Sequence, residues 1–284
     1  MNIVTNNCRY VPLTVVIFLY IFFSFNSKKN RSDVDESIND KKAEGKQEIG
    51  PLSTARVDCV PLSLQDFLES DLTYGQHELD QRMKRYITGT HGIYVESGAH
   101  DGISFSNTLI YSKQRCWSGI LVEPSIIGAL AAQKNRPFDI VVNAALVSPL
   151  QRGKVRGSFD GNFMSKISND PGGQEVDAFT LSHILEENGI KHLHWWSLDV
   201  EGFEMSALQG LDFKRWSPDY INIELWNNDS AVWEFLGARG YKAIADISPW
   251  KHFTPHRDVV FQSSTATKRM QMEMNFDYNR LPTH

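Results

Sequence analysis

Two glutamates stand at the ends of apolar segments, where a buried strand would reach its carboxyl end. Glu96 closes "IYVE" within "GIYVESGAHDG" (residues 92–102), and Glu123 closes "GILVE" 27 residues later. In open α/β sheets, such ends line the ligand crevice, and the second acid accepts hydrogen bonds from ribose hydroxyls. Gly98 and Gly102 form G-x-x-x-G, so the dinucleotide pattern G-x-G-x-x-G is absent, as is a phosphate-binding loop. The pattern favours an adenosyl ligand without phosphate, such as S-adenosylmethionine.

A second group of acids follows in "LDVEGFE" and "INIEL". Because side chains alternate along a strand, Asp199 and Glu201 would project to one side and join Asp101 and Glu224 at the crevice. A carboxylate with a raised pKa could take the proton of an acceptor hydroxyl. Three hard oxygen ligands could instead hold a divalent cation that acidifies this hydroxyl, or the acids could bind backbone amides and cap the next helix. The sequence does not choose the base among Asp199, Glu201 and Glu224.

Short apolar runs alternate with helix-like segments after Gly92, which predicts βαβ units and a mostly parallel sheet. The expected strands are 93–96, 119–123, 139–146, 194–200 and 220–225. The expected helices are "PSIIGALAAQK", "TLSHILEENG" and "EMSALQGL". The last two runs, "YKAIADI" and "HRDVVF", lack a helix between them and predict an antiparallel C-terminal strand. Trp195 and Trp196 are expected in the core.

The chain resembles the FkbM-type methyltransferase family. The resemblance lies in "GIYVESGAHDGISFSNTL" with "WSGILVEPS", and in "WSLDVEGFEMSALQGLDF" with "INIEL", over about residues 92–226. It implies a class I methyltransferase (Rossmann-like) fold, in which S-adenosylmethionine lies over Glu96, Gly98, Ala99, Asp101, Gly102 and Glu123. Asn107 is a further candidate cofactor residue, beside a role in orienting the following helix. The implied reaction is methyl transfer to a hydroxyl oxygen, often on a sugar or a polyketide-like acceptor.

The net charge of the chain disfavours a nucleic-acid partner. The formal net charge is −5 and the sequence pI is about 6.0, so no basic footprint for a phosphate backbone is expected.

The N-terminal region predicts a membrane attachment. Residues 11–25, "VPLTVVIFLYIFFSF", are uncharged and no small-residue cleavage site follows them, which favours a short uncleaved signal anchor of an early-secretory membrane. We expect the anchor within residues 1–26, a charged flexible stem over 27–58, the methyltransferase-like domain over 59–265 and a polar tail over 266–284.

The sequence gives conflicting signals about the side of the membrane on which the domain lies. Cations follow the apolar run, and the positive-inside rule would place the domain in the cytosol. Family likeness favours the lumen of the endoplasmic reticulum or Golgi, where the sequons at Asn30 and Asn228 would matter. Of the three cysteines, Cys59 and Cys116 lie beyond the anchor, so one disulfide can form.

Two functions follow from these observations. The first is a membrane-anchored, S-adenosylmethionine-dependent O-methyltransferase that acts on a glycan or another hydroxylated small-molecule or secretory acceptor. The second is a non-catalytic protein similar to Star-like membrane proteins, which move membrane-protein cargo from endoplasmic reticulum to Golgi and through endosomes. An enzyme must hold the cofactor and present a base, whereas an escort can lose either and keep the fold.

Overall fold

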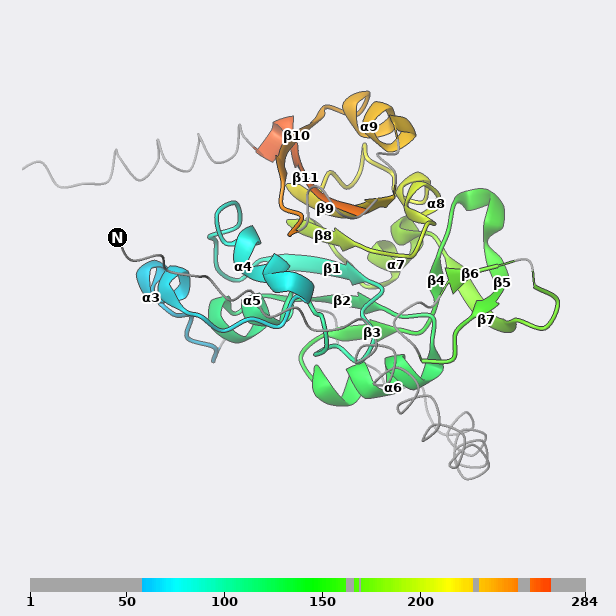
Figure 1. The fold of residues 1–284 in the computed structure, drawn as a ribbon, viewed down its shortest axis with the longest axis horizontal. Coiled ribbons are helices and arrows are strands. Elements are labelled where there is room, and N and C mark those ends of the chain that lie inside the picture. The colour runs from blue at the N-terminus through cyan, green and yellow to red at the C-terminus, as the bar shows by residue number, and fades with distance from the viewer. Residues whose placement is uncertain (1–57, 162–165, 169, 227–229, 250–255, 267–284) are drawn as a thin grey trace, which may run out of the picture. The chain divides into compact units, whose positions relative to one another are not determined.

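Seven strands form the main sheet of the computed structural model, in the order β10-β11-β9-β8-β1-β2-β3 (Figure 1). The structure describes residues 58–161, 166–168, 170–226, 230–249 and 256–266. The strand bounds are β1 Ile93–Ser97, β2 Ser118–Val122, β3 Ile140–Val142, β8 Trp195–Leu198, β9 Tyr220–Trp226, β10 Tyr241–Asp246 and β11 His256–Ser263. Strands β3, β2, β1, β8 and β9 are parallel, whereas β11 is antiparallel to both of its neighbours. The predicted mostly parallel α/β sheet with an antiparallel C-terminal strand is confirmed.

A second sheet of four strands was not predicted. Its order is β4-β7-β5-β6, and its strands are β4 Ala145–Leu146, β5 Gly153–Ser158, β6 Lys166–Ile167 and β7 Gln174–Phe179. Figure 1 shows it beyond the carboxyl ends of β1 and β2. Strands β5 and β7 are mostly exposed and carry the cross-strand ion pairs Lys154–Asp177 and Arg156–Glu175. Because they bury little, they lack the apolar runs by which a strand is recognised.

The single strand predicted over 139–146 was wrong. The run divides at Asn143 into β3 of the main sheet and β4 of the small sheet. The Asn143 side-chain amide donates to the carbonyl oxygens of Glu123 and Pro124, at 2.9 Å each. These two bonds hold the chain against the end of β2, at the point where it leaves the main sheet.

The helices begin and end at residues with the appropriate capping chemistry. Helix α6 (Ile126–Asn135) begins after Ser125, whose hydroxyl accepts from the Gly128 N–H, and α7 (Leu181–Glu187) begins after Thr180, whose hydroxyl accepts from the His183 N–H. Both helices confirm predictions, as does α8 (Glu204–Gln209). The others are α3 Leu64–Glu69, η2 Gln76–Glu78, α4 Leu79–Met83, α5 Leu109–Arg115, η3 Pro149–Gln151 and α9 Ser230–Gly237.

The core lies on both faces of the main sheet, and β8 joins its two halves. Trp195 and Trp196 are 0 % exposed and belong to different apolar clusters, because neighbouring strand residues face opposite sides. Their indole N–H groups donate to the side chains of Asn222 and Ser97 at 2.7 and 2.9 Å. The predicted core position of both tryptophans is confirmed.

The N-terminal part of the described chain is fastened to α5. A disulfide joins Cys59 to Cys116, and the Arg115 guanidinium donates to the carbonyl oxygens of Leu62 and Thr88. The predicted anchor and stem lie outside the described residues. Across residues 58–266, where the structure describes them, we find no helix that is both long enough and apolar enough to cross a bilayer.

We predict that loss of the disulfide destabilises the domain. The bridge closes a loop of 57 residues, and the chain-entropy model gives about 4 kcal/mol for such a loop. Cys59→Ser with Cys116→Ser should therefore lower the Tm by roughly 10 °C. Thermal melts with and without reductant test this: the reductant should lower the Tm of the parent chain and leave that of the double variant unchanged. Equal melting of the parent chain in both conditions would contradict the prediction.

Candidate functional site

A cleft lies at the carboxyl ends of β1, β2 and β8, with both sheets contributing to its walls. The turn after β1, the end of β2 and the loop after β8 supply most of its polar groups. The small sheet adds β4 and β6 through Ala145, Leu146, Lys166 and Ile167, and Phe159 directly follows β5. The polar lining comprises Gln76, Ser97, His100, Ser104, Asn107, Glu123, Lys166, Asp199, Glu201 and Asp258. This is the edge at which the sequence places its candidate ligand crevice.

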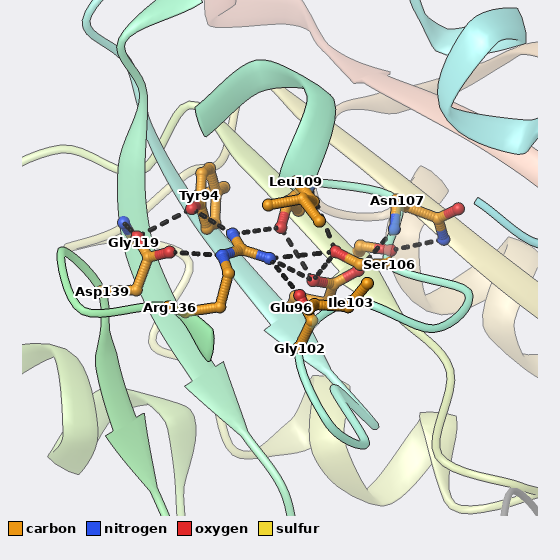
Figure 2. Close-up of polar contacts among 12 residues, drawn as sticks. Tyr94, Glu96, Gly102, Ile103, Ser106, Asn107, Leu109, Gly119, Arg136 and Asp139 are labelled. Atoms are coloured by element: carbon orange, nitrogen blue, oxygen red, sulfur yellow. Dashed lines mark hydrogen bonds and ion pairs between the residues drawn. The ribbon is translucent and has the colours of Figure 1, made fainter. Parts of the chain in front are cut away.

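Glu96 binds the chain that follows its own strand (Figure 2). Its carboxylate accepts from the Ser106 hydroxyl, the Asn107 N–H and the Thr108 hydroxyl, at 2.7, 2.6 and 2.7 Å. The side chain is 4 % exposed and does not line the cleft. Burial raises the pKa of Glu96, while the nearby Arg136 and the three donors oppose this rise. Glu96 therefore holds the loop, where the sequence analysis expected a direct ligand contact.

Arg136 is the cation of this network, and the sequence analysis missed it. The side chain is 2 % exposed and donates to Asp139, the Gly102 carbonyl and the Ser106 hydroxyl at 2.8, 2.8 and 3.1 Å. Its guanidinium lies 3.9 Å from the Glu96 carboxylate. Although burial acts to lower the pKa of Arg136, the neighbouring oxygens outweigh it and raise this pKa. No motif signals this role, because Arg136 simply follows α6 in the sequence.

The two glycines of the turn make room for protein groups. Gly98 has φ +78°, and a Cβ there would lie 2.1 Å from the Asp199 carbonyl oxygen. Gly102 has φ +74°, and a Cβ there would lie 2.8 Å from Cγ of Arg136. Side chains at either position are therefore excluded by the strands and helices packed against the turn. Of the two, Gly98 lines the cleft.

Ala99 and Asp101 shape the same turn and do not line the cleft. Ala99 is buried, and its N–H donates to the Val122 carbonyl at 3.2 Å. The Asp101 carboxylate accepts from the N–H groups of Ile103 and Ser104, at 2.9 and 2.7 Å. Partial burial acts to raise the pKa of Asp101, but these bonds outweigh it and lower the pKa. Asp101 thus caps the turn. It does not belong to the group of acids that it was expected to join.

Glu123 and Asn107 reach the cleft. Glu123 is 3 % exposed, and its two oxygens accept from the N–H groups of His100 and Ser125 at 2.8 Å each. Burial raises its pKa, and those two bonds oppose the rise. Asn107 donates through Nδ2 to the Ser197 hydroxyl at 3.1 Å, and its Oδ1 is buried without a hydrogen-bond partner among the described residues. The cleft thus offers acceptors to a ligand rich in donors.

Asp199, Glu201 and Glu224 do converge, as predicted. One carboxylate oxygen from each lies within 4.8 Å of the others. The geometry differs from the extended chain that was expected: β8 ends at Leu198, and Glu201 has a left-handed φ of 55°. The convergence arises because a tight turn follows β8 and because Glu224 stands on the adjacent strand β9. Such an oxygen set can also serve a divalent cation.

Burial and mutual repulsion raise the pKa values of these acids. The pKa of Asp199 rises well above its usual value because of burial and the nearby Glu224, with which it shares a hydrogen bond. Burial and Asp199 raise the pKa of Glu201 to about 7, against the opposing effects of His256 and Lys166. Burial and Asp258 raise the pKa of Glu224 to about 7. The group therefore holds protons near neutral pH and titrates as a unit.

Two further residues complete the acid group. Asp258 of β11 lines the cleft, and burial and Asp199 raise its pKa to about 7. The sequence did not indicate this role for Asp258, because only the β11–β9 pairing brings Asp258 opposite Glu224. Glu204 accepts from the N–H groups of Val200 and Gly202 at 3.1 Å each. It thereby fills the backbone-binding role that was the alternative for the candidate acids.

Comparison with known proteins points to one family. The profile of the methyltransferase FkbM domain matches residues 96–243. No curated protein sequence matches the chain.

Three solved structures illustrate the structural similarity. A TehB-like SAM-dependent methyltransferase from Corynebacterium glutamicum has a TM-score of 0.40 and 11 % identity, covering 69 % of this chain and 90 % of that one. Precorrin-6y C5,15-methyltransferase from Geobacter metallireducens has a TM-score of 0.39 and 13 % identity, and the match covers 68 % of this chain and 90 % of that one. Magnesium protoporphyrin IX methyltransferase from Synechocystis, with bound SAM, has a TM-score of 0.37 and 11 % identity, and the match covers 62 % of this chain and 71 % of that one. At these low scores, the fold assignment rests on strand order and the family match.

We predict that Asp258 makes the domain less stable as the pH rises. Its folded pKa of about 7 exceeds the value of about 3.9 expected in the unfolded chain. The folded state therefore holds more protons between these values, and the associated stability, fully present below about pH 4, is lost as the pH rises through about 7. Asp258→Asn removes this loss.

Thermal melts at pH 5.5 and pH 8 test the prediction. The Tm of Asp258→Asn minus that of the parent chain should be more positive at pH 8. The matched change at an exposed acid, Asp212→Asn, should shift the Tm equally at both pH values. A pH-independent difference for Asp258→Asn would refute the assignment of a raised pKa.

Proposed function

The chain belongs to the FkbM methyltransferase family, and on that premise we propose that it methylates a hydroxyl oxygen of an acceptor with S-adenosylmethionine as the donor. The acceptor is a glycan or another hydroxylated product of the secretory pathway. Family membership supports the donor, and the acid group at the cleft supports a reaction in which a proton must leave the acceptor. The observation that carries the proposal is Glu201, a cleft-lining carboxyl group whose pKa is about 7.

The residues of the cleft fit the donor. S-adenosylmethionine supplies an electrophilic methyl group when bound. The Glu123 carboxylate at the end of β2 would accept from the ribose hydroxyls, since each oxygen that binds a backbone N–H keeps a further lone pair. The turn at Gly98 brings the chain close to this ligand.

In the proposed reaction Glu201 acts as the general base. Glu201 would take the proton of the acceptor hydroxyl on a carboxylate oxygen while the methyl group passes from the donor sulfur to the acceptor oxygen. The S–C bond would break as the O–C bond forms, so the products would be a methyl ether, S-adenosylhomocysteine and protonated Glu201. A pKa near the working pH suits this role, because the base is then largely ionised and still basic enough to take the proton. Lys166 lies on the cleft wall and favours the charged form of Glu201.

Asp199 and Glu224 support the base. Asp199 shares a hydrogen bond with Glu224, whose Oε1 lies 3.0 Å from Nδ1 of His256. In this arrangement the proton held by Asp199 limits the negative charge facing Glu201. If the three acids instead held a divalent cation, the cation would acidify the acceptor hydroxyl, and transfer would stop on chelation.

We place the domain in the lumen of the endoplasmic reticulum or Golgi, attached through an anchor at residues 11–25. The Cys59–Cys116 bond supports this placement, because disulfides persist in oxidising compartments and are rare in the cytosol. Alkylation of free thiols at the moment of cell lysis tests whether the disulfide exists in the cell, and so tests the compartment. Both cysteines should be protected from alkylation; alkylation of both would place the domain in a reducing compartment.

Two measurements test the function. Calorimetry on the full chain should detect binding of S-adenosylmethionine and its demethylated product S-adenosylhomocysteine. Incubation with methyl-labelled S-adenosylmethionine and a panel of glycans and hydroxylated small molecules should transfer label in the presence of a chelator. Binding without transfer would favour the Star-like escort function, and absence of binding would overturn the proposal.

Glu201→Gln should separate chemistry from binding. With an acceptor found in that panel, the change should lower kcat about 100-fold or more and leave cofactor affinity nearly unchanged. Activity of the parent chain should rise as the pH increases through about 7, because the base works in its ionised form. Glu187→Gln, at an exposed position of α7, is the matched control and should retain full activity. An unchanged kcat in Glu201→Gln would exclude Glu201 as the base.

A further inference from the structure

Backbone strain is concentrated at the cleft. Seven of the described residues other than glycine have a left-handed φ, a conformation that is unfavourable for any residue with a Cβ. Three of these seven line the cleft: His100, Phe105 and Glu201. Such strain persists only where the surrounding structure enforces it, and it is common at functional sites. Phe105 is the largest apolar side chain of the three, and the reaction proposed above gives it no role.

The chain on both sides holds Phe105 in place. Ser104 donates to Asp101 through its N–H and its hydroxyl, at 2.7 and 2.9 Å. Ser106 donates its hydroxyl to Glu96 at 2.7 Å (Figure 2). Phe105 itself forms an isolated parallel bridge with the residue that precedes η2. The structure therefore fixes a large apolar residue in a strained conformation at one defined place.

The Phe105 ring lies at the opening of the cleft. The residue is 49 % exposed, whereas Glu123, which would bind the donor ribose, is 3 % exposed. Among the described phenylalanine and tryptophan residues, Phe138 and Trp226 are also exposed, and neither lines the cleft. An exposed ring leaves apolar surface in contact with water. Exposure and backbone strain together favour a ring that is placed to pack against a ligand.

The cleft combines this ring with groups that bind hydroxyls. The side-chain amide of Gln76 can donate and accept, and the carboxyl groups of Glu201 and Asp258 can accept. Leu79 and Phe203 add further apolar surface. A pyranose has the matching chemistry, because one face of the sugar ring presents apolar C–H groups while its hydroxyls project around the edge. A linear polyol carries the hydroxyls and lacks such a face.

We propose that Phe105 binds the acceptor, and that its ring packs against the C–H face of a pyranose whose hydroxyl then reaches Glu201. The inference deepens the proposed function and rests on it, since it narrows the acceptor to a sugar in its ring form. Phe105 binds the sugar and Glu201 takes its proton, so changes at the two positions should affect KM and kcat separately.

Matched sugars test the acceptor class without turnover. The methyl pyranosides of glucose, galactose, mannose and fucose carry hydroxyls on a ring, and the corresponding alditols carry them on a linear chain. Saturation-transfer NMR on the full chain with S-adenosylhomocysteine should show transfer from aromatic protons of the protein to the C–H protons of at least one pyranoside, and none to its alditol. Equal transfer to both, or transfer to neither, would overturn the pyranose subsite.

Calorimetry with S-adenosylhomocysteine distinguishes this failure from a failure of the proposed function. Binding of the nucleoside by a chain that does not distinguish pyranosides from alditols would leave the proposed function standing. Absence of nucleoside binding would overturn both.

Variants at position 105 separate sugar binding from folding. Phe105→Gly removes the ring and also the Cβ that makes this φ unfavourable, so it should melt close to the parent chain and lose the pyranoside signal. Phe105→Tyr keeps a ring and should keep the signal. Phe138→Ala is the matched control, since Phe138 is exposed and does not line the cleft, and it should retain the signal. With a pyranoside that accepts the methyl group, Phe105→Gly should raise KM about tenfold.

Two results in Phe105→Gly would contradict the assignment. A parental pyranoside signal in the folded variant would remove Phe105 from the acceptor site. A loss of affinity for S-adenosylhomocysteine would assign the ring to the donor and would equally overturn the proposal. The comparison of pyranosides with alditols on the parent chain remains decisive if the variant does not fold.

Discussion

The buried bond set between Glu96 and the loop after β1 is the constraint on which the cleft depends. A carboxylate in the core is costly unless donors surround it, and here residues 106–108 donate three hydrogen bonds while Arg136 supplies a nearby positive charge. The loop supplies the hydrogen-bond donors that the buried Glu96 carboxylate needs. In turn, these bonds fix the path of the loop. Asn107 faces the cleft because its backbone is held in this way.

A second constraint is electrostatic, and it acts among the acids of the cleft. Several carboxyl groups meet beside the loop after β8, with Lys166 and His256 as nearby favourable partners for charge. Neighbouring buried acids cannot all ionise, so protons are distributed among them near neutral pH. The close spacing of these carboxyl groups lowers the stability of the folded state at high pH. It also raises the pKa of a carboxyl group enough for it to act as a base near neutral pH. A cationic ligand would relieve this repulsion, which links donor binding to the state of the acids.

The elements that bury apolar runs were predictable from the sequence, as were the acids at their ends. Glu123, Asp199 and Glu201 follow recognisable strands and Glu224 lies near the end of another, and strand ends are where an α/β sheet presents its ligands. The small sheet escaped prediction because its exposed strands carry ion pairs in place of an apolar pattern.

Other features depend on contacts between distant segments. Asp258 joins the site only through antiparallel pairing of β11 with β9, and Arg136 reaches Glu96 across 40 positions of the sequence. The sequence also predicted Glu96 at the right strand end and assigned it to a ligand, since pattern alone does not tell whether a carboxylate faces the cleft or its own loop. Local periodicity therefore finds the sheet edge, and tertiary packing decides which of its residues remain available.

The most direct measurement is a crystal structure of the protein with S-adenosylhomocysteine. The account predicts the nucleoside in the cleft beside Glu123 and Gly98, and the Glu96 carboxylate still bonded to residues 106–108. A nucleoside bound outside this cleft, or a Glu96 that has left its loop to contact the ligand, would contradict it.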